Sequence, residues 1–443
     1  MDTRSRLTRM IVLAALALAT LAAIGWMLRP SAPSVAERAP SHAGALHYDA
    51  AIERVNAILA GATDLAAQHD DEWLFQERLA NAHIARARLT GSFEDYAAAD
   101  AALKRAFTQA PKGAGPHQAM AALDMSLHRL DAAAKMLDAI DHYAVKSEAG
   151  VQTELAGARG DIAFYRGDYA GAARIYAAAD PAGEDSGISF RLANLQARTG
   201  DPDGALKTLD MIQRSARLPQ AQFLADLALR RGTIALQRGD WDKAAADFDK
   251  AGAIFPGWWL VEAHRAQMLA LRGDSDGAIA RFTAILKASS SPDLMDALAS
   301  LYRAKGDRVK ASFWSDQARN SWNERLRLIP EAAWGHAIEH ILAFGNPNEA
   351  LPLAEADYRA RPYGLTATSL GWVLIANNRP ADALKVIEPV LRSKWVSAEA
   401  HLAAAQAHLL LGQTDAADRE QRAALAINPR AADPASALIW FGH

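Results

Sequence analysis

The chain has 443 residues, no cysteine, a formal net charge of −3 and 51% apolar residues. Charged residues make up 22% and the mean hydropathy is −0.10, which excludes both a disordered chain and a polytopic membrane protein. The absence of cysteine excludes disulfides, thiolate metal sites and a cysteine nucleophile.

The N-terminus holds a segment long enough to span a membrane. Residues 10–28 carry no charge, and at 1.5 Å per residue a helix over them would cover about 28 Å. Arg4, Arg6 and Arg9 precede it, so the positive-inside rule places residues 1–9 in the cytoplasm and the body across the membrane. We expect an uncleaved transmembrane signal-anchor. A cleaved signal peptide is the alternative, although its apolar region is normally about 7–15 residues long.

A short tether is expected to follow the anchor. Residues 29–46 are rich in Pro, Ser and Ala, a composition typical of flexible linkers. The first thirty residues hold four Arg and one Asp, so the rest of the chain is more acidic than the chain as a whole. An acidic body lacks the basic surface that nucleic acid requires, and we expect no nucleic-acid partner.

The rest of the chain is organised by an internal repeat. Blocks such as GDYAGAARIY (167–176) and GDWDKAAADF (239–248) place an alanine five residues after a glycine. The alanines recur at spacings of 33, 34 or 39 residues, at Ala99, Ala133, Ala172, Ala205, Ala244, Ala278, Ala311, Ala350, Ala383 and Ala417. The first two blocks share the alanine without the glycine. Ten occurrences at this regularity indicate a repeat array.

Each unit is predicted to be a pair of helices. The glycine between them, replaced by Asn378 in one unit, should end the first helix in a left-handed cap, and an acidic residue or proline should begin the second. The repeated alanine, and a small residue seven positions before the glycine, should let the helices cross closely. Ile338 breaks this pattern and predicts a wider pair. The 39-residue spacings predict helices or loops about five residues longer at three places.

This pattern resembles the tetratricopeptide repeat family over residues 72–429, in about ten units. The resemblance implies an all-α, right-handed superhelical solenoid of antiparallel helix pairs with an inner concave groove. A solenoid must cover its end faces, so we expect an N-terminal capping helix region at 47–71 and a C-terminal cap at 430–443. The apolar residues 439–441 could instead dock a partner.

In this family, fixed positions of each first helix line the groove. Here those positions hold mostly acids, amides and aromatic rings: Glu154, Asp161, Phe190, Asn194, Asp226, Gln267, Asp293, Asp296, Glu339, Trp372 and Gln406. We predict that they bind a partner, because amides can bond an extended backbone and carboxylates can meet Lys or Arg. Ordinary solvated residues are the alternative at each position. The basic clamp that binds C-terminal carboxylates in this family is missing, so an acidic tail is not the expected ligand.

One motif in the sequence could support catalysis. His336, Glu339 and His340 match the H-x-x-E-H pattern of inverted zinc proteases, in which two histidines on one helix face hold the metal and the Glu acts as base. The motif falls in register within a repeat, and no further segment offers a third ligand. We therefore expect plain helix histidines, no metal site, no cofactor and no catalytic residue.

The predicted function is a non-enzymatic protein–protein interaction scaffold, anchored through residues 10–28 in a bacterial inner membrane with its repeats in the periplasm. Proteins resembling this assemble envelope complexes for polysaccharide synthesis or export, secretion, pilus assembly or cofactor-protein maturation. The expected partners are other envelope proteins, and no small-molecule substrate is expected. A periplasmic chaperone for export clients is the alternative, and a zinc-dependent hydrolase at His336, Glu339 and His340 is a further one.

Overall fold

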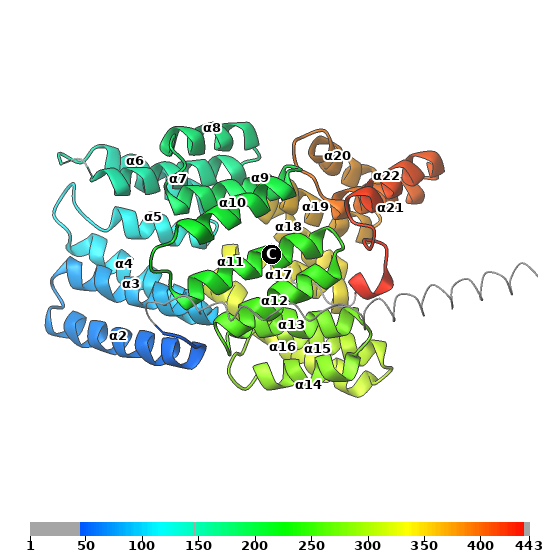
Figure 1. The fold of residues 1–443 in the computed structure, drawn as a ribbon, viewed down its shortest axis with the longest axis horizontal. Coiled ribbons are helices and arrows are strands. Elements are labelled where there is room, and N and C mark those ends of the chain that lie inside the picture. The colour runs from blue at the N-terminus through cyan, green and yellow to red at the C-terminus, as the bar shows by residue number, and fades with distance from the viewer. Residues whose placement is uncertain (1–44, 146, 438–443) are drawn as a thin grey trace, which may run out of the picture. The chain divides into compact units, whose positions relative to one another are not determined.

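The computed structural model describes residues 45–145 and 147–437, and every regular element there is a helix (Figure 1). The helices are α2 (Tyr48–Gln68), α3 (Trp73–Thr90), α4 (Phe93–Gln109), α5 (His117–Ser126), α6 (Leu130–Asp141), α7 (Ala149–Tyr165), α8 (Tyr169–Ala179), α9 (Ser186–Arg198), α10 (Pro202–Ser215), α11 (Ala221–Gln237), α12 (Trp241–Ile254), α13 (Trp259–Leu271), α14 (Ser275–Ile285), α15 (Pro292–Ala304), α16 (Arg308–Leu328), α17 (Pro330–Phe344), α18 (Pro347–Ala360), α19 (Gly364–Ala376), α20 (Pro380–Leu391), α21 (Ala398–Leu410), α22 (Thr414–Ile427) and the short 3-10 helix η1 (Pro434–Ala437).

The predicted anchor, residues 10–28, lies outside the described residues, as does most of the predicted tether. Among the helices that the structure does describe, none combines the length and the apolar character needed to cross a membrane.

Ten helix pairs build the described body, as the repeat predicts. They run from α3–α4 to α21–α22, and the two helices of each pair pack against each other (Figure 1). Helix α2 precedes the first pair and packs on α3, where Leu59 and Ala62 meet Ala82. The all-helical fold of paired helices is thereby confirmed.

The turn inside each pair follows the expected chemistry, with one exception. Asn378 has a φ of 57°, as a left-handed cap requires, and six of the repeat glycines also have positive φ. The first two units reach the same geometry with Gly91 and with His128, whose φ is 63°. Gly345 is the exception: its φ is −108° because Asn346 caps α18 directly and shortens the connection by one residue. The prediction of a left-handed cap at Gly345 is therefore wrong.

Small residues hold the helices of a pair together. Nine of the ten repeated alanines are buried, and only Ala311 is half-buried. Gly232 of α11 lies under the ring of Phe248 of α12, where an added Cβ would come within 2.4 Å of a ring carbon. In the pair α17–α18, where Ile338 replaces the small residue, Ile338 and Ala354 are both buried in the same apolar cluster.

The three 39-residue spacings correspond to longer helices. Helices α7 and α11 have 17 residues each, and α16 has 21. The first helices of ordinary units, such as α9 and α13, have 13. The irregular units therefore extend helices, as predicted.

Residues far apart in sequence bring successive turns of the solenoid into contact. The Trp259 Nε1 donates to the Leu89 carbonyl, 170 residues away. The Gly364 amide donates to the Tyr169 hydroxyl at 2.9 Å across 195 residues. The C-terminal segment joins this packing: η1 contacts α13, and Arg430 stacks on Trp241 at 4.1 Å. This segment therefore packs on earlier units, while residues 438–443 lie outside the described range.

Substitution of Gly232 tests this packing. Gly232→Ala forces a methyl group against the fully buried Phe248 ring, which costs about 1–3 kcal/mol. The better helix propensity of alanine offsets about 0.8–1 kcal/mol of that. We expect a net loss of about 1 kcal/mol in the free energy of unfolding, measured with urea.

The matched control is Gly61→Ala in α2, where an added Cβ meets nothing within 4 Å. Only the propensity gain remains there, so this variant should be stabilised. Equal stabilisation of both variants would contradict close packing at Gly232.

Candidate functional site

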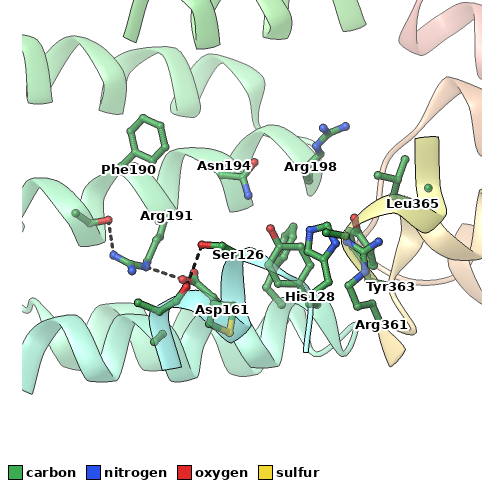
Figure 2. Close-up of a pocket in the computed structure, with 18 of the residues that line it drawn as sticks. Ser126, His128, Asp161, Phe190, Arg191, Asn194, Arg198, Arg361, Tyr363 and Leu365 are labelled. Carbon is green, nitrogen blue, oxygen red and sulfur yellow. Dashed lines mark hydrogen bonds and ion pairs between the residues drawn. The ribbon is translucent and has the colours of Figure 1, made fainter. Parts of the chain in front are cut away.

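A cavity of about 800 Å³ lies inside the solenoid. Helices α5, α7, α9 and α11 line one part of it, and α17, α18, α19 and the segment before α21 line another. Figure 2 shows side chains from these separate elements turned toward a common space. The cavity is thus lined by residues from both of the superhelical turns that contact each other: the earlier turn, which contains α5 to α11, and the later turn, which contains α17 to α21.

Six of the eleven predicted groove residues line this cavity. They are Glu154, Asp161, Phe190, Asn194, Asp226 and Glu339. Phe190, Asn194 and Arg198 are four residues apart along α9, so they share one helix face. All three line the cavity. Glu154 and Asn194 are exposed and form part of the rim.

Five predicted groove residues do not line it: Gln267, Asp293, Asp296, Trp372 and Gln406. Gln267 is buried in α13 and pairs with the His264 ring at 2.9 Å. Trp372 packs against the core of the pairs α17–α18 and α19–α20. Their placement in the groove was inferred from repeat register alone, and it stays a prediction.

Asp293 and Asp296, two of the five residues that do not line the cavity, pair with the histidines of the H-x-x-E-H motif. His336 Nδ1 lies 3.0 Å from Asp293 Oδ1, and its ring stacks on Trp322. His340 Nδ1 lies 2.6 Å from Asp296 Oδ1. Trp322 Nε1 donates to the other oxygen of Asp296 at 2.8 Å. Each histidine is thus held by a different carboxylate of α15. Within the described residues, no group of three or more His, Cys, Asp or Glu side chains could hold a metal.

Asp161 has a largely structural environment. Its two oxygens accept from the Tyr176 hydroxyl at 2.7 Å and from Arg191 Nε at 2.8 Å. Burial raises the pKa of Asp161, and the Arg191 ion pair opposes that rise. Because both oxygens are engaged, Asp161 offers less to a ligand than the exposed Glu154 does.

The floor of the cavity is a chain of aromatic rings. His128, Tyr165, Tyr363 and Trp395 follow one another with ring centroids 6.4, 5.2 and 5.6 Å apart. Tyr165 belongs to the earlier turn, whereas Tyr363 and Trp395 precede α19 and α21 in the later turn. Figure 2 labels His128 and Tyr363 among the residues that line the cavity. We call these four residues the ring floor.

Two arginines accompany the ring floor. Arg361 stands 5.7 Å from the Tyr363 ring and is held by Asp357 at 2.6 Å. Arg198 stands 5.5 Å from the Trp395 ring, and burial lowers the pKa of Arg198. The cavity therefore combines basic and aromatic groups at its floor with exposed acidic and amide groups at its rim.

The repeat pattern did not identify the ring floor. His128 occupies a turn, and Tyr363 and Trp395 lie in segments between units. The only available signal was the clustering of aromatic residues just outside helices, which a self-comparison of repeats does not weigh.

Comparisons with known proteins match part of the chain to a repeat family. A family model described as "Tetratricopeptide repeat" matches residues 163–227. A search of curated proteins gave no match. Among solved structures, a tetratricopeptide repeat protein from Parabacteroides merdae is 14% identical, with 58% of this chain and 99% of that chain covered and a TM-score of 0.35.

Two further solved structures cover more of the chain. Yeast Tom70 is 15% identical, with 88% of this chain and 92% of that chain covered and a TM-score of 0.38. The APC/C hetero-tetramer Cut9–Hcn1 is 15% identical, with 89% and 83% covered and a TM-score of 0.37. At these identities and scores the similarities carry no argument about what this chain binds.

The His336 pair predicts a dependence of stability on pH. Burial by itself would lower the pKa of His336, but the carboxylate of Asp293 raises it to about 9. A histidine with a raised pKa stabilises the fold fully below its unfolded pKa of about 6.5, and that stabilisation is lost as the pH rises through 9.

We expect the difference in unfolding free energy between the wild type and His336→Asn to shrink by about 3 kcal/mol from pH 6 to pH 9.5, because a pKa that is higher in the folded state by about 2.5 units corresponds to about 1.4 kcal/mol per unit. Urea unfolding at both pH values measures it. A difference that does not change with pH would show that His336 is not charged in the folded protein.

Proposed function

We propose, from the premise that this chain is a tetratricopeptide-repeat protein, that it is a non-enzymatic protein–protein interaction scaffold that receives a segment of its partner in the central cavity. The observation that carries the proposal is the gathering of Glu154, Phe190, Asn194, Asp226 and Glu339 around one cavity. Repeat solenoids use such inner surfaces to bind other proteins.

The rim defines the expected chemistry of the partner. Glu154 and Asn194 are exposed there, and Asp226 is only loosely paired, with Arg230 Nε 3.5 Å from its carboxylate. Carboxylates at a rim attract Lys and Arg of a partner and mainly set the rate and specificity of association. We therefore expect a partner segment that is basic rather than acidic.

We further propose that the scaffold is anchored in a bacterial inner membrane through residues 10–28, with its repeats in the periplasm. This rests on the uncharged segment and the three arginines before it. The partners would then be envelope proteins of a polysaccharide, secretion, pilus or cofactor-protein maturation system.

The zinc-hydrolase alternative has little geometric support. His336 and His340 each engage a separate aspartate of α15, and Glu339 lies 3.8 Å from His336. A catalytic zinc needs three protein ligands around one point and an open position for water. The chaperone alternative differs from the scaffold in predicting many weakly bound clients.

The test is affinity capture of the tagged full-length protein from crosslinked, detergent-solubilised membranes. The rim variant is Glu154→Ala with Asp226→Ala, and we expect it to recover about tenfold less partner because two rim carboxylates are lost. The control is Asp242→Ala with Asp276→Ala, which removes the same charge from two carboxylates that are 97% and 84% exposed elsewhere.

One or two proteins captured by the wild type and the control, but lost by the rim variant, would support the scaffold. Equal capture by both variants would refute the cavity as its binding site. Many proteins at low yield would favour the chaperone.

A further inference from the structure

The turns inside the early helix pairs lie against segments that precede or follow later pairs. In four such contacts, a Cβ added to the turn glycine would come within 3.1 Å of the later residue. The contacts join Gly91 to Trp259, Gly167 to Pro362, Gly200 to Val396 and Gly239 to Asn428. At the third contact, the Val396 amide also donates to the Arg198 carbonyl at 2.9 Å. We call this line of contacts the seam, because it joins the first five pairs, α3 to α12, to the last five, α13 to α22.

Three of the equivalent turns in the last five pairs have no such cover. A Cβ added to Gly273, Gly306 or Gly412 would meet no other described residue within 4 Å. Residues 409–411, three leucines directly before Gly412, are exposed, whereas Leu89, close to the first glycine of the seam, is buried. These turns therefore form an edge that a further turn of the solenoid could cover.

The segments that begin the early pairs are uncovered as well. Leu74 at the start of α3, Val145 before α7 and Leu218 before α11 are all exposed. Leu218 and Trp395 each lie three residues before the first helix of a pair, but Leu218 is 69% exposed and Trp395 only 5%. Exposed apolar groups thus gather on the two edges where the seam stops, and such groups mark interaction sites.

The two edges carry opposite charges. Residues 70–72, before α3, are Asp, Asp and Glu, and all three are exposed. Residues 305–310 hold three Lys or Arg and one Asp around the exposed Val309. The two lysines of this segment have ion pairs at the surface, where such pairs contribute little. We call residues 70–74, Val145 and Leu218 the acidic edge, and residues 305–310 and 409–411 the basic edge.

We propose that a second copy of this chain docks its acidic edge on the basic edge of the first copy, so that the seam continues from one copy to the next. Within one chain, the seam already joins surfaces of these two kinds. The free edges are the same structural positions at the two ends of the repeat array. Their charges are opposite, as between partners that associate specifically, and contact would bury the exposed apolar groups of both.

The association is head-to-tail because the two edges are different surfaces. Each added copy offers a new free edge, so copies form chains that grow, or rings where the rotation closes, rather than two-fold dimers. No residue of either edge lines the central cavity. The inference therefore stands or falls independently of partner binding in the cavity.

The test measures the mass of the full-length protein in micelles of an uncharged detergent by analytical ultracentrifugation. We expect the wild type to form species of increasing mass as its concentration rises. The acidic-edge variant is Leu74→Lys with Leu218→Lys, and the basic-edge variant is Val309→Glu with Leu410→Glu. Each variant places charge against like charge of the neighbouring copy, so each should associate at least about tenfold more weakly than the wild type.

All four substituted residues are exposed, so the variants should keep the fold. The control is Met211→Lys, which changes an exposed apolar residue of α10 that belongs to neither edge. This variant should associate as the wild type does.

Mixing the two edge variants in equal amounts tests the head-to-tail geometry. The acidic-edge variant keeps an intact basic edge, and the basic-edge variant keeps an intact acidic edge. The mixture should therefore form dimers that grow no further, although each variant alone stays monomeric. Such dimers also show that both variants are folded.

Four results would overturn the inference. They are a wild type that stays monomeric at every concentration, a wild-type dimer that does not grow, edge variants that associate as strongly as the wild type, and a mixture of folded variants without dimers. If a variant fails to fold, salt decides the question in the wild type. Opposite charges predict that association weakens as the salt concentration rises, and association that is insensitive to salt would contradict docking between these edges.

Discussion

Contact between successive turns is the constraint on which the rest of the structure depends. The hydrogen bond from the Gly364 amide to the Tyr169 hydroxyl joins residues 195 positions apart. Around it, Phe164, Tyr363 and Trp395 form one buried aromatic cluster with Tyr169. Helix pairs alone would form an open spiral, in which each unit touches only its neighbours. The aromatic cluster closes that spiral and turns an open groove into a cavity with a floor.

The contact between the turns also explains where the charged residues around the cavity lie. Asp161 with Arg191, and Asp357 with Arg361, are ion pairs that line the cavity. Buried charges are tolerated only when they are paired, and removing one partner is costly. The rim residue Glu154 is exposed, and its carboxylate accepts a single long hydrogen bond from Gln118 Nε2 at 3.4 Å. The cavity therefore separates residues that maintain its walls from residues that are available to a partner.

The sequence predicted the helix pairs because their determinants are local. A cap such as Asp240, whose carboxylate accepts from the Lys243 amide, lies three residues from its partner, and the small residue Gly232 meets Phe248 within the same unit. The groove was predicted in part, since the α9 face of Phe190 and Asn194 follows from helical spacing. The ring floor could not be predicted, because its residues meet across two turns and no local pattern records that pairing.

The most direct test of the closed solenoid uses the absence of native cysteine. A Cβ on Gly200 would lie 4.0 Å from the Val396 Cβ, within the usual range of about 3.5–4.5 Å for a disulfide. The account predicts that Gly200→Cys with Val396→Cys forms an intramolecular disulfide under mild oxidation, seen on a non-reducing gel. The control, Gly200→Cys with Val309→Cys, shares any strain at Gly200, whose φ is +91°, but places the second thiol at a position that is 82% exposed. Equal yields from the two pairs would contradict contact between the turns.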